Sequence, residues 1–269
     1  MSGIIKKLKI IEGENIVFVI TGGGSGVGRA LALALAKRGR QVLVIGRRDH
    51  LIQETASLSS HIVSLCADVS TQEGLQAIKH YTDSIPLIEG LVNNAGSLEP
   101  IVALKDIKKE EWQQTLKTNL DAPLFLSQML LKQLENGRVL NIGSGAAYFA
   151  IKGWGAYCVS KAALSMLTRC WQLESETVAF ASVTPGIIDT DMQAIARESS
   201  HMDSEQADFY RRLKNNNRLI STETLAEFLT WLLLDTDKDL YISQEWDIYD
   251  TAHHDKWLKP PHQVLHWDH

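Results

Sequence analysis

The chain has 269 residues, a length that suits one large α/β domain. Its composition, 45% hydrophobic and 22% charged, is that of an ordinary globular protein, and a net charge of −5 argues against a nucleic-acid partner. The sequence has no apolar run of roughly eighteen residues, so no membrane span is expected. The first nine residues lack the apolar core and cleavage site of a secretory signal, so a cytoplasmic protein is expected.

The elements predicted along the chain alternate between short β-branched runs and longer helical stretches. Strands are expected at residues 15–20, 41–45, 61–65, 89–93, 138–142 and 178–183, and within 241–249. Helices are expected at residues 26–38, 49–58, 109–134, 157–174 and 222–234, and from a cap at Ser70 or Thr71 to residue 81. Near-continuous apolar strands between helices predict a doubly wound, mostly parallel sheet of the Rossmann type, with helices on both faces, in a single domain.

Two segments fit this pattern less well. Residues 191–219 are polar and helix-prone and follow a strand, where such sheets bind ligands, so they predict either a substrate lid or a surface helical insertion. We expect residues 1–250 to form the dinucleotide-binding and catalytic domain, followed by a tail of residues 251–269. Trp257 and Leu258 in the tail could pack on a partner subunit or cover the active site, and an unstructured end beyond Pro260 is the other possibility.

A glycine-rich loop lies between the first strand and the first long helix. It reads Thr21-Gly22-Gly23-Gly24-Ser25-Gly26-Val27-Gly28. Glycine permits left-handed backbone angles and close approach of a ligand, and the helix that follows presents free N–H groups to a phosphate. The loop therefore predicts a dinucleotide site, although its spacing is not the strict G-x-G-x-x-G pattern.

The end of the second strand indicates which dinucleotide is bound. NAD sites place an acid there to bind the ribose hydroxyl, but this chain has Gly46 followed by Arg47 and Arg48. Guanidinium groups pair well with a 2′-phosphate, so NADP(H) is predicted and NAD(H) is less favoured. Arg47 and Arg48 could instead be solvated turn residues, with Asp49 neutralising one of them.

Tyr157 and Lys161 are four residues apart, on one face of the predicted helix. A nearby ammonium and a positive nicotinamide would lower the pKa of the phenol and make it a usable general acid and base. Ser144, just after the fifth strand, is placed to hydrogen-bond the substrate oxygen. A Tyr-x-x-x-Lys pair alone is more often an ordinary pair on a helix surface.

Taken together, these motifs resemble the short-chain dehydrogenase/reductase family, in its shorter, single-domain branch, over residues 15–249. The G-x-x-x-G-x-G spacing, the segment Asn93-Asn94-Ala95-Gly96 and the set of Asn119, Ser144, Tyr157 and Lys161 match in order and approximate spacing. The resemblance implies that Asn119 holds a water that links Lys161 to solvent, and that Lys161 also binds the nicotinamide ribose.

The resemblance also assigns residues to the cofactor. Asp68 and Val69 match the position that contacts the adenine ring, although Asp68 could simply cap a turn. Asn94, Ala95 and Gly96 would support the sheet beside the cofactor. In the segment that begins Pro185-Gly186, Ile188 and Thr190 would contact the nicotinamide carboxamide.

The function predicted is hydride transfer between NADP(H) and a small carbonyl or alcohol, with Tyr157 as general acid and base. Two alternatives stay open: an NAD-dependent alcohol dehydrogenase, and a non-catalytic NADP-binding sensor or scaffold. The family commonly forms homodimers or homotetramers through the two long helices, here residues 109–134 and 157–174. Residues that surround the motifs could line an apolar pocket, although each could equally belong to the core: Tyr148, Phe149, Trp154, Ile187 and Met192.

A metal site is not expected. The cysteines Cys66, Cys158 and Cys170 have no metal-type spacing, and their odd number argues against a disulfide framework. The tail carries several histidines, but their spacing matches no compact metal motif. Packing by Trp257 and Leu258 and an unstructured end beyond Pro260 and Pro261 both stay open for the tail.

Overall fold

The computed structural model describes residues 16–198 and 202–265, and its centre is one parallel sheet of seven strands. The spatial order is β3-β2-β1-β4-β5-β6-β7, and every neighbouring pair is parallel. The strands span β1 Ile16–Thr21, β2 Gln41–Gly46, β3 Ile62–Cys66, β4 Leu87–Asn93, β5 Arg138–Ile142, β6 Ala179–Thr184 and β7 Trp246–Asp247. This confirms the predicted Rossmann-type fold.

The point where the strand order reverses positions the site. From β1 the chain winds outward through β2 to β3, and then crosses back so that β4 lies on the other side of β1. The loops after β1 and β4 therefore leave the sheet side by side at its carboxyl edge. In open α/β sheets this crevice is where ligands bind.

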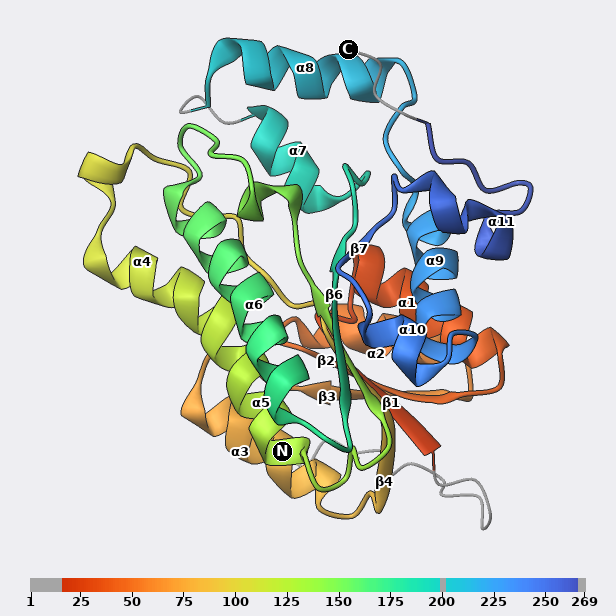
Figure 1. The fold of residues 1–269 in the computed structure, drawn as a ribbon. Helices are drawn as coiled ribbons and strands as arrows, with labels where there is room; N and C mark the ends of the chain where they lie inside the picture. Colours follow the sequence, from red (N-terminus) through yellow and green to blue (C-terminus); the bar gives the residue numbers. More distant parts are fainter. Residues whose placement is uncertain (1–15, 199–201, 266–269) are drawn as a thin grey trace.

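Helices cover both faces of the sheet (Figure 1). On one face α1 (Gly26–Lys37), α2 (Asp49–Ser57) and α9 (Thr222–Leu234) pack in a core that includes Phe18, Leu31 and Phe228. On the other face α3 (Gln72–Thr82), α5 (Ala122–Leu130) and α6 (Gly155–Glu174) pack around Leu126 and Phe180. Both cores are continuous and apolar, so hydrophobic burial holds each layer to the sheet.

One predicted helix is not continuous. The stretch at residues 109–134 divides into α4 (Lys109–Leu116), a π-helical turn (Lys117–Asp121) and α5, and it continues as hydrogen-bonded turns after Leu130. A π turn inserts one extra residue into the helix and redirects the side chains within it, and such turns are frequent at functional sites. Asn119 lies inside this turn and is buried.

The segment at residues 191–219 forms two helices, α7 (Asp191–Glu198) and α8 (Ser204–Asn215). Figure 1 shows α8 crossing one end of the molecule with α7 beneath it. Their inward side chains, among them Ala196, Tyr210 and Leu213, pack in a third apolar cluster together with Tyr157. The segment therefore lies over the carboxyl end of the sheet.

The tail begins after α10 (Lys238–Ile242) and β7 and contains α11 (His254–Trp257). His253 stacks on Phe228 of α9, with ring centroids 4.9 Å apart, and accepts a hydrogen bond at Nδ1 from the indole of Trp257, at 2.9 Å. Its Nε2 lies 3.0 Å from the backbone oxygen of Asp247. Trp257 thus packs on α9 in the main core, and the expectation that it covers the active site is wrong. His266 and His269 lie outside the described residues.

Candidate active site

The glycine loop is held in shape by the segment after β4. Gly22 and Gly26 have positive φ angles of 68° and 51°, and a Cβ added to Gly28 would lie 2.4 Å from the oxygen of Gly22. The side chain of Asn94 donates to the oxygens of Thr21 (2.8 Å) and Gly22 (3.2 Å). These contacts explain why glycine is required at three positions of the loop.

Thr21, the last residue of β1, also joins the glycine loop to the segment after β4. Its hydroxyl oxygen accepts hydrogen bonds from the backbone N–H groups of Asn94 and Ala95, both at 3.0 Å. At the start of α1 the Ser25 side chain makes no cap, so it leaves the amides of the first turn to another acceptor. A phosphate is the ligand that such an arrangement favours.

Both arginines predicted to select NADP lie beside this loop. Arg48 donates to the hydroxyl of Ser25 at 2.9 Å, and Arg47 is exposed at the end of β2. A Cβ added to Gly46 would come 2.9 Å from a methyl group of Ile52, so the position has no room for an acid without a shift. The end of β2 is thus cationic at the mouth of the glycine loop.

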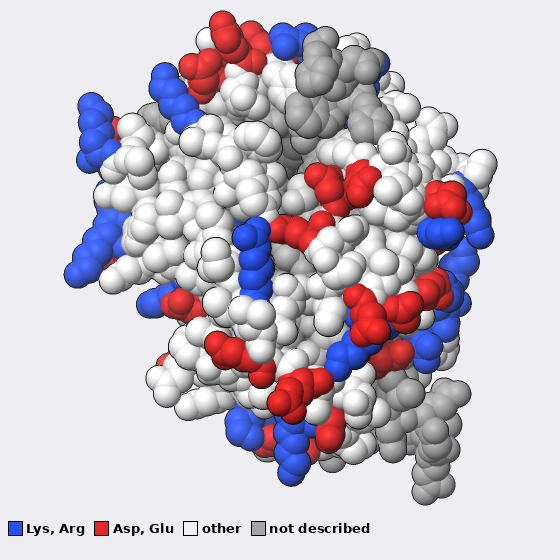
Figure 2. All heavy atoms as spheres, in the orientation of Figure 1, with Lys and Arg blue, Asp and Glu red and all other residues white. Residues whose placement is uncertain are grey.

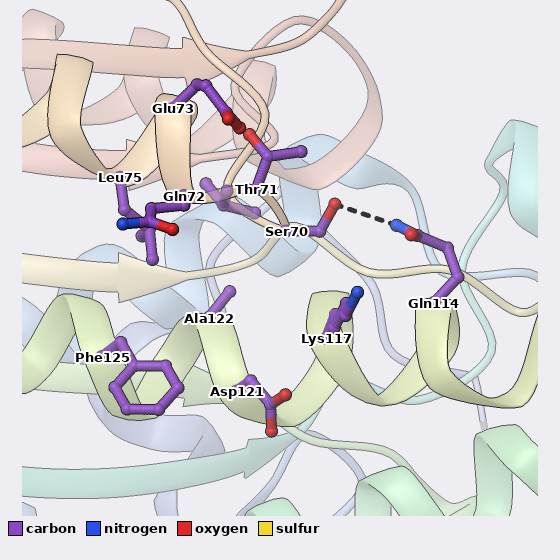
Figure 3. Close-up of a pocket in the computed structure, with 11 residues that line it drawn as sticks. Ser70, Thr71, Gln72, Glu73, Leu75, Gln114, Lys117, Asp121, Ala122 and Phe125 are labelled. Carbon is purple, nitrogen blue, oxygen red and sulfur yellow. Dashed lines mark hydrogen bonds between the residues drawn. The ribbon is translucent and has the colours of Figure 1, made fainter. Parts of the chain in front are cut away.

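Asp68 takes the role of a turn residue in this structure. Its Oδ1 accepts from the backbone N–H of Ser70 at 2.9 Å and from the Ser70 hydroxyl at 2.7 Å. The neighbouring Val69 lines a surface groove of about 480 Å³ between the start of α3 and the α4–α5 stretch. Figure 3 shows this groove, where Gln114 donates to Ser70. Of the residues predicted to bind the cofactor, only Val69 lines this groove.

The segment after β6 returns to the glycine loop. Gly186 has a φ of 78°, and Ile188 forms a parallel bridge with Ile220. The Thr190 side chain follows, and its Cγ2 lies 3.3 Å from the position of a Cβ added to Gly26. Pro185, Gly186, Ile188 and Thr190 therefore lie at the same edge of the sheet as the glycine loop.

Tyr157, Ser144 and Lys161 meet where β5 ends and α6 begins. The Ser144 hydroxyl is hydrogen-bonded to the Tyr157 phenol. The Lys161 ammonium lies 5.7 Å from the centre of the phenol ring and donates to the backbone oxygen of Ile142 at 2.7 Å. One turn of α6 separates Tyr157 from Lys161, so the helix places both on its inner face.

Burial dominates the acid-base properties of this pair. Tyr157 is only 7% exposed, and desolvation raises the pKa of its phenol to about 12, although the bond to Ser144 acts in the opposite direction. Desolvation also lowers the pKa of Lys161 to about 8. Desolvation therefore dominates the pKa of Tyr157 in the protein alone, and the fall expected with a positive nicotinamide beside the phenol stays a prediction.

Asn119 lies next to this group from the side of the π turn. Its amide nitrogen donates to the Ser97 oxygen and to the Ser160 hydroxyl, both at 2.9 Å, and its Oδ1 accepts from the Ser97 N–H at 2.8 Å. A Cβ added to Gly96 would lie 3.5 Å from Asn119 Oδ1 and 3.8 Å from Lys161 Nζ. The structure thus brings Asn119, Ser144, Tyr157 and Lys161 together at one place.

Aromatic and aliphatic side chains enclose the Tyr157 phenol. Trp154, Ile187 and Met192 lie in the same apolar cluster as Tyr157. Tyr148 and Phe149 do not belong to this pocket: both are exposed, and the Tyr148 hydroxyl bonds to Glu245. Both residues therefore lie outside the buried cluster around Tyr157.

Two residues of the enclosure were not foreseen from the sequence. Tyr210 of α8 stacks on Trp154, and Gln193 of α7 is buried although it is polar. Both belong to the segment at residues 191–219, whose pattern indicated helices but not their position. No local signal in the sequence identifies either residue.

Within residues 16–198 and 202–265, no three His, Cys, Asp or Glu side chains gather as metal ligands would. In the same described portion, no helix combines the length and apolar character that crossing a bilayer requires.

The chain is similar to known oxidoreductases. Residues 16–201 match the family described as short chain dehydrogenase. Benzil reductase ((S)-benzoin forming) from Bacillus subtilis is 34% identical over 229 residues, covering 81% of this chain and 93% of the relative. Sepiapterin reductase from Meriones unguiculatus is 34% identical over 256 residues, covering 87% and 96%. A short-chain dehydrogenase/reductase structure from Saccharomyces cerevisiae superposes with a TM-score of 0.83 at 28% identity, covering 90% and 99%.

Proposed function

Because the chain belongs to the short-chain dehydrogenase/reductase family and is an oxidoreductase of carbonyl or alcohol groups, we propose that it uses NADP(H) and that Tyr157 exchanges the proton with the substrate oxygen. The observation that supports this most directly is the position of the phenol. It is bonded to Ser144, lies within 5.7 Å of the Lys161 ammonium, and is enclosed by apolar side chains.

Each residue has a defined task in the reduction. The dinucleotide, when bound, supplies the hydride. Ser144 and Tyr157 hydrogen-bond the carbonyl oxygen and stabilise the negative charge that develops on it, and the phenol then gives up its proton. Lys161 would bind the nicotinamide ribose and stabilise the resulting phenolate. Asn119 would hold the water through which the proton returns. The apolar enclosure excludes bulk water and strengthens these interactions.

The residues around the glycine loop fit a dinucleotide phosphate. The loop glycines allow close approach, and the first turn of α1 offers unpaired amides. Gly46 stands where an NAD site would carry an acid, and Arg47 and Arg48, which follow it, are both exposed and could receive a 2′-phosphate. Asn94, Ala95 and Gly96 support the loop. Pro185, Gly186, Ile188 and Thr190 would contact the nicotinamide end.

One spectrophotometric assay tests the reaction and the cofactor. Oxidation of NADPH and NADH is followed with ketones, diketones, aldehydes and quinones. Turnover with NADPH is expected, and Tyr157→Phe should abolish it while cofactor binding persists. Unchanged turnover in Tyr157→Phe would remove the phenol from the mechanism. Cofactor binding without turnover by the native chain would favour a sensor or scaffold.

Cofactor choice is tested by charge reversal. Arg47→Glu should raise the KM for NADPH at least about tenfold and leave the KM for NADH nearly unchanged, because a carboxylate repels the 2′-phosphate only. Equal effects on both cofactors would defeat the phosphate argument. An enzyme that prefers NADH would be the NAD-dependent alternative.

We also propose self-association through the outer face of α6 and the α4–α5 stretch. Val159, Met166 and Leu173 are exposed and seven residues apart, so they form one apolar stripe along α6, and Phe125 of α5 is exposed as well. Figure 2 shows that the surface over α6 is largely uncharged. A homodimer or homotetramer would cover this area.

A further inference from the structure

The aromatic enclosure of Tyr157 has a specific geometry. Trp154 lies three residues before Tyr157 at the start of α6, and its indole meets the phenol edge to face, with centroids 5.7 Å apart and planes at 89°. The other neighbour of Trp154 is Tyr210 of α8, which stacks in parallel at 6.0 Å and 5°. Two flat rings from distant parts of the chain thus lie beside the phenol, and rings of this kind pack favourably against other aromatic groups.

The same enclosure contains polar groups without partners. Trp154 is 8% exposed, and its indole N–H has no acceptor among the described residues. Gln193 is also 8% exposed, and neither its amide nitrogen nor its amide oxygen has a partner in the described part of the chain. Buried polar groups are nearly always hydrogen-bonded, and leaving one unpaired costs free energy.

Gln193 and Trp154 reach the enclosure from different elements. Gln193 lies three residues before Ala196 on α7, so both face inward, and Ala196 packs in the cluster that contains Trp154 and Tyr157. The backbone N–H of Gln193 donates to the hydroxyl of Thr190, which lies beside the glycine loop. Gln193 thus lies along the chain between Thr190, which is beside the glycine loop, and Ala196, which packs in the aromatic cluster.

We propose that Trp154 and Gln193 form a polar subsite for a second oxygen of the substrate, and that the stacked pair Trp154–Tyr210 receives an aryl group. This inference rests on the proposed function. Because Trp154 contacts the Tyr157 ring, the second oxygen must lie close to the reacting carbonyl. The substrate class is then an aryl vicinal diketone.

The reaction on such a substrate balances. A hydride from NADPH forms the new C–H bond at one carbonyl carbon, the C=O π bond breaks, and the oxygen takes the proton of Tyr157. The products are NADP⁺ and an aryl α-hydroxyketone. The second carbonyl stays unreduced and keeps its hydrogen bond from the indole N–H of Trp154, while Gln193 offers a donor and an acceptor beside it.

Four substrates separate the two parts of the proposal: benzil, deoxybenzoin, diacetyl and butanone. Benzil and deoxybenzoin share the aryl groups and differ by one carbonyl, while diacetyl and butanone repeat that difference without rings. We expect Trp154→Phe to lower the benzil-to-deoxybenzoin ratio of kcat/KM about tenfold, the value of one hydrogen bond to a buried donor. Gln193→Leu should lower the same ratio. Tyr210→Leu should lower the benzil-to-diacetyl ratio instead.

Trp257→Phe is the matched control, because Trp257 is equally buried but packs on α9 and its N–H already bonds to His253. It should leave all ratios unchanged. Equal loss on all four substrates in Trp154→Phe would mean that the indole only supports the fold, and unchanged ratios in both Trp154→Phe and Gln193→Leu would overturn the subsite.

Measuring how tightly substrates bind to an inactive variant tests the subsite independently of catalytic activity. Calorimetry with Tyr157→Phe and saturating NADPH should show tighter binding of benzil than of deoxybenzoin, and adding Trp154→Phe should remove most of this difference. If the native chain reduces neither these four substrates nor any other ketone, aldehyde or quinone of the wider panel, the proposed function fails. Equal affinity of benzil and deoxybenzoin for the NADPH-loaded protein defeats the subsite alone.

Discussion

Lys161→Met is expected to stabilise the apoprotein while destroying its activity. Burial lowers the pKa of Lys161 from 10.5 to about 8, which corresponds to about 3 kcal/mol of destabilisation when the amine is protonated. The substitution also removes the hydrogen bond to the oxygen of Ile142, worth about 1 kcal/mol. The net gain in the free energy of unfolding is about 2 kcal/mol, or about 5 °C in Tm for a chain of this size.

The sign of this effect depends on pH. Below pH 8 the lysine is protonated in both states, so the folded protein carries the full cost of a buried charge. Between pH 8 and 10.5 the unfolded chain holds the proton and the folded chain does not, so the stability of the native protein rises with pH. The gain in the free energy of unfolding from Lys161→Met should therefore be largest at pH 7 and disappear above pH 10.5.

Thermal unfolding of the cofactor-free protein at a series of pH values measures this difference. Lys117→Met is the control, because Lys117 is exposed on the π turn and should leave Tm unchanged at every pH. Reductase activity of Lys161→Met should fall at least about a hundredfold, the usual range for losing general acid–base assistance. A variant that is less stable than the native protein at pH 7, or a difference in Tm that does not vary with pH, would refute the reasoning.

Three further outcomes follow from buried and exposed groups. Gln193→Leu should raise the free energy of unfolding by about 1 kcal/mol, because it removes a buried amide without partners, and denaturant titration measures this. Met166→Glu should shift the chain toward monomers in analytical ultracentrifugation, because it places a charge within the apolar stripe of α6. Burial holds the pKa of His253 below 6.5, so native stability should fall as pH drops below 6.5, where the unfolded chain takes up the proton. His253→Phe should flatten that fall in a pH series of unfolding curves.

The local sequence was sufficient to predict the position of most strands and helices. Strand β5 and helix α9 begin and end where the apolar pattern places them, at Arg138–Ile142 and Thr222–Leu234. Two features of the sequence predict α9. Ser221 caps the first turn by accepting a hydrogen bond from the N–H of Thr224, and a nearly continuous apolar run follows. The other strands lie within a residue or two of the predicted bounds. Periodicity and caps are properties of neighbouring residues, so a sequence displays them directly.

The π turn at Asn119 could not be predicted in this way. The residues Lys117–Asp121 include no glycine or proline, and their helical propensity is ordinary. The turn is tied to contacts across the chain, because the Asn119 amide bonds to Ser97 and to Ser160, 22 and 41 residues away. Propensity cannot report an interaction of that range.

Tertiary contacts also decide the lining of the pocket. Trp154 and Tyr210 are 56 residues apart in sequence and meet only because α8 crosses the end of the sheet. Tyr148 stands closer to Ser144 in sequence than Tyr157 does, yet it points outward to Glu245. Proximity to a motif along the chain is thus a poor guide to which side chains enclose a site.

The two pKa shifts at the site bear on the direction of the reaction. Desolvation moves both groups toward their neutral forms, so the protein by itself keeps the proton on the Tyr157 phenol, with a pKa of about 12, and makes the Lys161 amine easier to deprotonate, with a pKa of about 8. A protonated phenol is the form that reduction consumes, whereas alcohol oxidation needs the phenolate as base. With Tyr157 as the proposed proton donor, the side chains alone would favour carbonyl reduction at neutral pH. Deprotonation of the phenol becomes easier as pH rises, so oxidation should gain more from rising pH than reduction does.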